Sequence, residues 1–234
     1  MKISVVSPSN RSDGLEIVSK CLMKQTFSNN DFEWLICGPT FTGISYHIPE
    51  PKKKKGDFYN LNKAWNACFN RAKGELIVSI VDYTEFEPDT LAKLWEHYVD
   101  NPTVCISGLG VQYKDGKISW VDPRIERNSV YLISPVDMEL RLASIPRRAI
   151  QAVGGMDEEY DKVVAISEKE LCLRIGSLGY KFYVDKGIIY KFYAHEDHGS
   201  EWDRLYSKSV EMLNKHTFEL LGGTRKKLNY VNRE

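Results

Sequence analysis

Short apolar runs alternate with helically spaced apolar residues along the first hundred positions of the chain. Aliphatic runs that are typical of buried strands lie at 3–7, 33–37 and 76–81. Apolar residues recur every three or four positions, which predicts helices, over 14–24, 57–73 and 89–99. Because strands and helices alternate, we expect an α/β fold built on an open, mostly parallel sheet that helices flank.

The second half of the chain predicts shorter and less regular elements. Three β-like stretches at 103–107, 110–113 and 117–121 surround a KDGK turn, so we expect a hairpin and a small antiparallel element. Helices are predicted at 146–152, 168–178 and 201–221, with a strand at 180–184. We expect one domain over residues 1–221, followed by a basic tail at 222–234 without ordered structure.

Composition excludes several classes of protein. The 32 basic and 32 acidic residues cancel, so no overall charge favours nucleic acid or an anionic membrane. No stretch approaches the 18 apolar residues of a membrane span, and five single cysteines without a CxxC pair suggest reduced thiols. These features predict a soluble, cytoplasmic protein.

An acidic cluster follows the third predicted strand. The segment GELIVSIVDYTEFEPDTL at 74–91 places Asp82, Glu85 and Glu87 between the strand and the next helix. Open α/β sheets bind ligands at this position, and carboxylates there can hold a divalent cation that neutralises a diphosphate. The alternative is a solvated acidic loop, since acidic residues also favour helix starts.

Several segments resemble, in order and spacing, the GT-A fold of family 2 glycosyltransferases over about residues 2–200. The segments that carry this resemblance are ISVVSPSNR, NKAWNACFNRAKGELIVSIVDYTEFEPDTL, ASIPRRAIQAVGGMDEEY, SEKELCLRIGSLGYKFY and HEDH. The resemblance implies a transferase that moves a sugar from a nucleotide-sugar, with a UDP-sugar as the expected donor, to an acceptor hydroxyl with inversion. It also implies a donor-binding half at 1–100 and an acceptor-binding half at 101–221.

The resemblance assigns roles to individual residues. Residues expected beside the nucleotide-sugar are Pro8, Ser9, Asn10, Arg11, Asp82 and Tyr83. A cation, Mn²⁺ or Mg²⁺, is expected on Asp82 together with His195 or His198, because an imidazole ligand suits manganese better than magnesium. Glu168 is the expected base that receives the acceptor proton, and Glu170 is expected to position the acceptor.

The chain departs from the family pattern at three places. The usual Asp-x-Asp reads Asp82-Tyr83-Thr84, so a second carboxylate is missing and Glu85 is a possible substitute. The Glu-Asp base motif reads Ser167-Glu168. The acidic pair after the second strand reads Gly38-Pro39, so we expect Asp57 or Lys63 to contact the base of the nucleotide instead.

Two alternatives to a saccharide transferase stay open. The acceptor could be a modified DNA base, which the PKKKK run at 51–55 and the basic residues 225–227 would favour. The chain could also be a non-catalytic module that binds a nucleotide-sugar. Trp65, Trp95 and Trp120 are expected in the core rather than as platforms for sugar rings.

Overall fold

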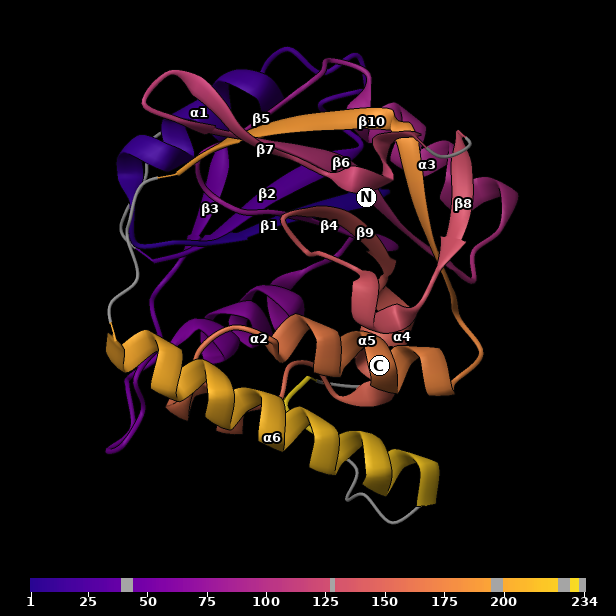
Figure 1. Cartoon of the computed structure of the whole chain (residues 1–234). Coiled ribbons are helices and arrows are strands. Elements are labelled where there is room, and N and C mark those ends of the chain that lie inside the picture. The colour runs from indigo at the N-terminus through magenta and orange to yellow at the C-terminus, as the bar shows by residue number, and fades with distance from the viewer. Residues whose placement is uncertain (39–43, 127–128, 195–199, 223–227, 232–234) are drawn as a thin grey trace.

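The computed structural model describes residues 1–38, 44–126, 129–194, 200–222 and 228–231. The first half alternates strands and helices as expected (Figure 1). Its elements are β1 (Ile3–Pro8), α1 (Ser12–Leu22), β2 (Phe32–Cys37), β3 (Ser45–Ile48), α2 (Leu61–Arg71), β4 (Leu76–Ile80), β5 (Thr84–Phe86) and α3 (Thr90–Asp100). The short strands β3 and β5 were not predicted, because neither has a long apolar run.

The second half contains longer strands than the sequence predicted. Its strands are β6 (Val104–Lys114), β7 (Lys117–Val121), β8 (Val130–Ile133), β9 (Leu142–Pro146) and β10 (Lys181–Tyr193). Its helices are α4 (Arg147–Val153), α5 (Ser167–Ser177) and α6 (Ser200–Gly222), with short 3₁₀ turns η1 (Pro123–Glu126), η2 (Pro135–Asp137) and η3 (Glu158–Lys162). The predicted hairpin is the β6–β7 pair.

One sheet runs through both halves in the order β3-β2-β1-β4-β9-β6-β10-β5, with β7 beside β6 and β8 beside β10. Pairing is parallel from β3 to β4, and β9 enters antiparallel between β4 and β6. The predicted open α/β sheet with parallel pairing and an antiparallel element in the second half is confirmed. The antiparallel element is larger than one hairpin, because β5, β8 and β9 also pair in this sense.

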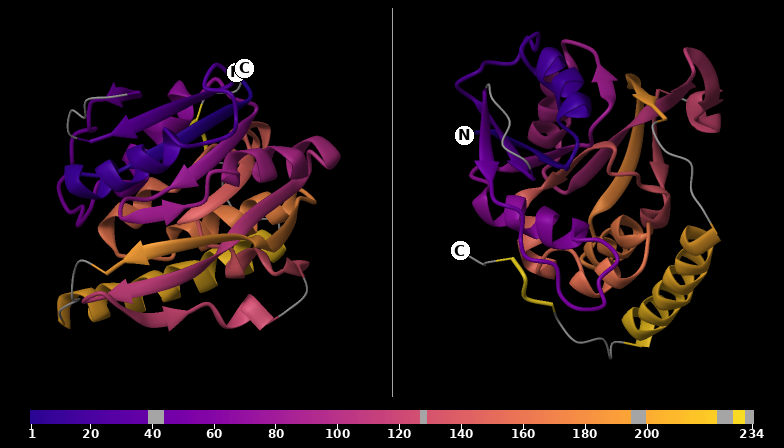
Figure 2. Two further views of the ribbon diagram at one scale, coloured as in Figure 1. Left: turned by 90° about the horizontal axis from the view of Figure 1, so that it is seen from above. Right: turned by 90° about the vertical axis from the view of Figure 1, so that its left-hand side faces the viewer.

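Helices cover both faces of the sheet (Figure 1). One core lies under α2, α4 and α5 and contains Trp65, Ile150 and Leu171, while the other lies under α1 and α3 and contains Leu15 and Leu91. Helix α6 lies along the outer side of α5 (Figure 2). These two cores hold the central strands rigidly, so the ends of those strands are fixed points.

The three tryptophans that were expected in the core have different surroundings. Trp65 is buried, and Trp95 is partly buried against the core beneath α3. Trp120 is 39% exposed on β7, a strand whose five residues are all exposed. The expectation of a core position is therefore wrong for Trp120, because β7 lies at the edge of the sheet and pairs with β6 alone among the described strands.

Residues 228–231 of the predicted tail contact the domain, where no ordered structure was expected. Val231 is 2% exposed and belongs to the core beneath α2 and α4. The backbone N–H groups of Tyr230 and Val231 donate to the Gly154 carbonyl oxygen at 2.9 and 3.2 Å, and Asn70 donates to the Tyr230 carbonyl oxygen at 3.0 Å. One apolar residue and three hydrogen bonds therefore attach the tail to the domain.

All five cysteines are buried and unpaired, in line with the expected reduced thiols. Within the described ranges, no helix combines the length and the apolar character that crossing a membrane requires.

The buried tail predicts a stability effect. Val231→Asp places a carboxylate in the core, so we expect it to lower the free energy of unfolding by about 3 kcal/mol in urea titrations. Val99→Asp is the matched control, because Val99 is 60% exposed on α3 and the same change there should cost little. Equal effects of the two changes would contradict the packing of the tail.

Candidate functional site

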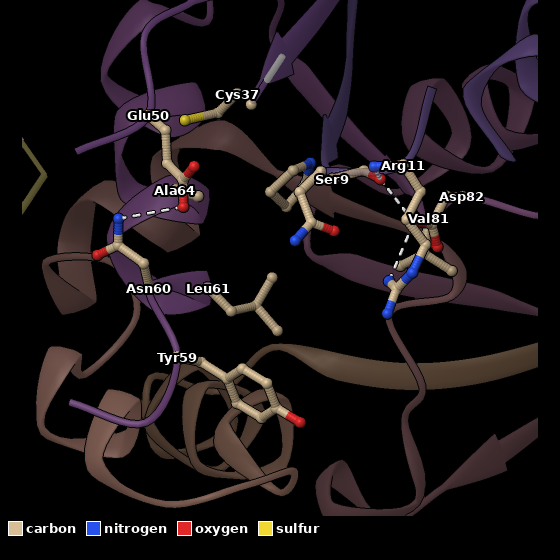
Figure 3. Close-up of a pocket in the computed structure, with 13 residues that line it drawn as sticks. Ser9, Arg11, Cys37, Glu50, Tyr59, Asn60, Leu61, Ala64, Val81 and Asp82 are labelled. Atoms are coloured by element: carbon tan, nitrogen blue, oxygen red, sulfur yellow. Dashed lines mark hydrogen bonds and ion pairs between the residues drawn. The ribbon is translucent and has the colours of Figure 1, made fainter. Parts of the chain in front are cut away.

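A cavity of about 330 Å³ opens at the carboxyl ends of β1, β2 and β4 (Figure 3). Ligands in open α/β sheets bind at this edge. The residues that line the cavity are Pro8, Ser9, Asn10, Arg11, Cys37, Gly38, Glu50, Tyr59, Asn60, Leu61, Ala64, Val81 and Asp82. Five of the residues that the sequence assigned to the nucleotide-sugar therefore lie together, namely Pro8, Ser9, Asn10, Arg11 and Asp82.

Two residues of the loop after β1 hold the Asp82 carboxylate. Ser9 Oγ donates to Asp82 Oδ2 at 2.5 Å, and Arg11 Nη1 lies 3.4 Å from the same oxygen. Asp82 is 8% exposed, and its Oδ1 accepts no hydrogen bond from a described residue. One oxygen of the carboxylate is thus fixed by the protein, and the other is left for a ligand on the wall of the cavity.

Close backbone approach at this edge requires glycine. A Cβ on Gly38, whose φ is +152°, would lie 1.8 Å from the Ser9 carbonyl oxygen. A Cβ on Gly14 would lie 2.8 Å from Asp82 Cβ. Larger residues at either position would push apart the loops that hold Ser9 and Asp82.

The two residues after Asp82 turn away from the cavity. Tyr83 has a φ of +55°, and its hydroxyl donates to the Asp13 carboxylate, which raises the pKa of Tyr83 to about 12. Thr84 is fully buried, and its hydroxyl donates to the Asp82 carbonyl oxygen at 3.3 Å. Tyr83, which was expected to contact the nucleotide-sugar, is not part of the cavity wall.

Glu85 does not replace the missing second carboxylate. It lies on β5 beside a separate cavity of about 480 Å³ between α1 and β5. Lys191 donates to Glu85 at 3.0 Å and the Tyr193 hydroxyl donates to it at 2.6 Å, and these bonds lower the pKa of the Glu85 carboxyl, the tyrosine bond most. Glu85 thus lines this second cavity, whereas Asp82 lines the one at the ends of β1, β2 and β4.

Asp57 and Lys63 are part of a buried ionic cluster that includes Asp161. The Lys63 ammonium is 6% exposed, bonds to Asp57 and lies 3.3 Å from Asp161 Oδ2. Asp161 also accepts hydrogen bonds from the backbone N–H groups of Asn62 and Lys63 at 2.8 and 3.3 Å, so it caps the start of α2. Neither Asp57 nor Lys63 is among the residues that line the cavity, and the expectation that one of them contacts the nucleotide base stays a prediction.

Glu168 lies in the first turn of α5, directly after two residues in the left-handed region. Ala165 and Ile166 have φ values of +54° and +64°, a conformation that costs about 1–3 kcal/mol for each residue that is not glycine. Such strain is concentrated at functional sites. Burial raises the pKa of the Glu168 carboxyl, which makes its carboxylate a stronger base.

Arg141 connects Glu168 with the cavity. It directly precedes β9, and its carbonyl oxygen accepts a hydrogen bond from the Val81 backbone at 3.0 Å, so it lies opposite the residue before Asp82. Its guanidinium is close enough to Glu168 to oppose, by its charge, the rise of the Glu168 pKa. Arg141 thus neighbours Val81 through its backbone and acts on Glu168 through its charge.

Glu170 has a structural role in this arrangement. It is fully buried, and Arg174 donates to both of its carboxylate oxygens at 2.8 and 2.7 Å. Arg174 in turn donates to the carbonyl oxygens of Val153 and Gly155, each at 2.7 Å. Both carboxylate oxygens of Glu170 are thus engaged within the protein, and the expectation that Glu170 positions the acceptor stays a prediction.

A possible metal-binding group near Glu170 is held by the same arginine. Asp157, Glu170 and His216 offer ligand atoms within 4.8 Å of one another. Because Arg174 already neutralises Glu170, this group forms an ion-pair network and lies outside the cavity. The expected metal ligands His195 and His198 lie outside the described residues.

Sequence reasoning missed the cavity wall opposite Asp82. Glu50 follows β3, and Tyr59, Asn60 and Leu61 lie at the start of α2 (Figure 3). Asn60 Nδ2 is 3.4 Å from Glu50 Oε1, which joins the two segments. The sequence contained one signal that could have indicated Glu50, because this residue stands between two prolines that fix the direction of the chain.

The likeness of this chain to known proteins lies in its fold. No family model matches the sequence, and a search of curated proteins finds no match. The solved structure of S. aureus TarS 1–349 is 12% identical with a TM-score of 0.66, and the match covers 92% of this chain and 65% of that one. GalNAc-T7 with UDP, GalNAc and Mn²⁺ is 14% identical with a TM-score of 0.66, and the match covers 90% of this chain and 48% of that one.

A third solved structure, S. aureus TarS 1–349 in complex with UDP-GlcNAc, matches 96% of this chain with a TM-score of 0.63 at 14% identity, over 71% of its own length. TarS and GalNAc-T7 are both GT-A glycosyltransferases, so the chain has the GT-A fold that the sequence resemblance predicted. The chain spans about two thirds of TarS 1–349 and about half of GalNAc-T7.

The partly buried Glu168 predicts a dependence of stability on pH. A carboxyl whose pKa is higher in the folded than in the unfolded state loses stability as pH rises from about 4.3, the value of an exposed glutamate, through its folded pKa. Glu168→Gln removes this loss, so the variant should be more stable than the parent chain at pH 7, and the gain should vanish below about pH 4.

Thermal unfolding of both proteins between pH 4 and pH 8 measures this difference. Glu16→Gln is the control, because Glu16 is exposed on α1. A difference between Glu168→Gln and the parent chain that stays constant with pH would contradict the raised pKa.

Proposed function

We propose that the chain is a glycosyltransferase of the family 2 type that moves a sugar from a UDP-sugar to an acceptor hydroxyl. The observation that carries this proposal is the cavity at the carboxyl edge of β1, β2 and β4, with Asp82 on its wall and Glu168 near Arg141. Proteins of the same fold have been solved with UDP-GlcNAc and with UDP, GalNAc and Mn²⁺. Residues 1–100 would bind the donor and residues 101–221 the acceptor.

The nucleotide would occupy the cavity between the loop after β1 and the start of α2. A volume of about 330 Å³ is in the range of small-molecule sites. Tyr59 and Leu61 offer apolar contacts to a planar base, and the Glu50 carboxylate can accept the N–H of a uracil ring. Glu50 would thus do the work that the sequence assigned to Asp57 or Lys63.

Asp82 fits a divalent cation through one oxygen. Oδ2 is engaged by Ser9 and Arg11, whereas Oδ1 is available on the cavity wall, and carboxylate oxygens are suitable ligands for Mn²⁺ or Mg²⁺. His195 or His198 would supply a second ligand. A bound cation would neutralise the diphosphate, and Arg11 adds a fixed positive charge at the same place.

Glu168 would act as the general base. As the acceptor hydroxyl attacks, its proton passes to Glu168, its oxygen bonds to the anomeric carbon, and the bond from that carbon to the diphosphate oxygen breaks with its electron pair. Attack from the side opposite the leaving group inverts the anomeric configuration. The raised pKa of Glu168 suits this role, since a stronger base accepts the proton more readily.

Calorimetry with UDP in the presence of MnCl₂ tests the donor site. We expect binding that MnCl₂ strengthens, and we expect Asp82→Ala to weaken binding in MnCl₂ by about 10- to 100-fold through the loss of a charged ligand. Asp100→Ala is the control, because Asp100 is exposed at the end of α3. Unchanged affinity of Asp82→Ala would remove the anchor from the proposal.

Glu168→Gln separates binding from catalysis. The amide keeps the size of the side chain but cannot accept a proton from the acceptor, so donor transfer or slow donor hydrolysis should fall by about 10²–10⁴-fold. UDP affinity should stay unchanged in the same preparation. Normal turnover by this variant would exclude Glu168 as the base.

The second candidate function is a non-catalytic nucleotide-sugar-binding module, which the Arg11–Asp82 contact favours because it engages the only carboxylate of the reduced Asp-x-Asp motif. In the experiments above, that module would bind UDP without help from MnCl₂ and would leave UDP-GlcNAc intact.

A further inference from the structure

An exposed tryptophan lies on β7, in the half of the chain that is proposed to bind the acceptor. Trp120 is 39% exposed and lies in the middle of β7, at the edge of the sheet. Its ring is 6.2 Å from the ring of Phe192, centroid to centroid, with an angle of 60° between the planes. A large exposed aromatic side chain next to buried ones is a surface on which a ring of a ligand can stack.

The strand register connects Trp120 to the Asp82 loop. Thr84 on β5 pairs with Phe192 on β10, Phe192 pairs with Gln112 on β6, and Gln112 pairs with Trp120 on β7. Neighbouring strands are about 4.8 Å apart, so this row extends roughly 15 Å from the Asp82 loop to Trp120. An acceptor of two or more linked rings has the length to cover it.

Arg141 lies between this row and the base. Its guanidinium carbon is 4.0 Å from the centroid of the Phe192 ring, and Arg141 is close enough to Glu168 to influence its pKa. The Arg141 side chain makes no hydrogen bond or ion pair with a described residue, and its Nε is buried without a partner. A buried donor without a partner is unfavourable, and an oxygen atom of a ligand would satisfy it.

Arg141 faces the acceptor side and not the donor cavity. Val81, its neighbour across the strands, lines the cavity, but Arg141 does not. Instead its guanidinium stacks on Phe192, in the direction of Trp120.

The charges nearby favour a saccharide over a nucleic acid. Glu139 lies close to both Glu168 and Tyr190, and its charge raises the pKa of both groups. The Glu139 carboxylate would repel a strand of phosphates, whereas sugar hydroxyl groups can donate to Glu139 and accept from Arg141.

We propose that Trp120, Phe192 and Arg141 form a subsite for a saccharide acceptor. A sugar ring stacks on Trp120, an acceptor oxygen accepts a hydrogen bond from Arg141, and the reacting hydroxyl lies at Glu168. This subsite rests on the proposed function, because it explains how the acceptor of that reaction is held.

A glycan array probed with the labelled full chain in the presence of UDP tests the subsite. Trp120→Ala should weaken binding to every retained glycan by about tenfold, and Arg141→Lys should also weaken it. Val121→Ala is the matched control, because Val121 follows on the same strand, is also 39% exposed and faces the opposite side. The affinity for UDP, measured by calorimetry, should be the same in all four proteins.

The possible outcomes separate this subsite from the proposed function. Glycan binding that Trp120→Ala leaves unchanged, or UDP binding without retention of any glycan, would overturn the subsite while leaving the donor site intact. A labelled single-stranded DNA that binds more tightly than any glycan and depends on Trp120 would overturn the saccharide assignment. Absence of UDP binding would instead count against the proposed function itself.

Discussion

The hydrogen bond from Ser9 to Asp82 is the interaction on which the arrangement of this site depends. Strands β1 and β4 are parallel neighbours, and Val6 pairs with Ser79. Ser9 and Asp82 each lie three residues beyond this pair, so the register alone brings them to the same height at the sheet edge. A slip of one strand would separate them, and the cavity would lose the only carboxylate that the Asp-x-Asp position retains.

Buried polar contacts also fix this strand register. Ser7 Oγ donates to the Ile80 carbonyl oxygen at 2.6 Å and accepts from Trp34 Nε1 at 3.0 Å. Three neighbouring strands, β1, β2 and β4, are thereby joined directly below the cavity. Buried hydrogen bonds are costly to leave unmade, so they favour one register over its neighbours. The edge of the sheet beneath the cavity is held rigidly for this reason, and rigidity is what a site for a small ligand requires.

The parts of the fold and site that local sequence determines were predictable. Buried strands such as β1 and β4 are visible as apolar runs, Asp82 follows directly from the second of these runs, and Ser9 and Arg11 were indicated by the family resemblance. Partners distant in sequence were not predictable. Lys63 is bound by Asp161, which lies 98 residues away, and nothing in the sequence near Lys63 distinguishes a lysine that binds a nucleotide from one buried in an ion pair. The burial of Val231 and the position of Glu50 on the cavity wall were not predictable for the same reason, since both depend on which surfaces meet after folding.

Glu168 and Glu170 show how two acids in one helical turn acquire different roles. Glu170 is fully buried but carries a bidentate arginine, so its charge is compensated and its oxygens are all engaged. Glu168 makes no ion pair with a described residue, and the two left-handed residues before it keep it at the start of α5. The helix terminus favours its anion, yet burial outweighs this effect and raises the pKa. Selection for stability alone would favour an ion-pair partner for both acids, or the replacement of one of them. The unpaired carboxylate of Glu168 lowers stability, and such groups are concentrated at functional sites, which is the physical reason to place proton transfer there.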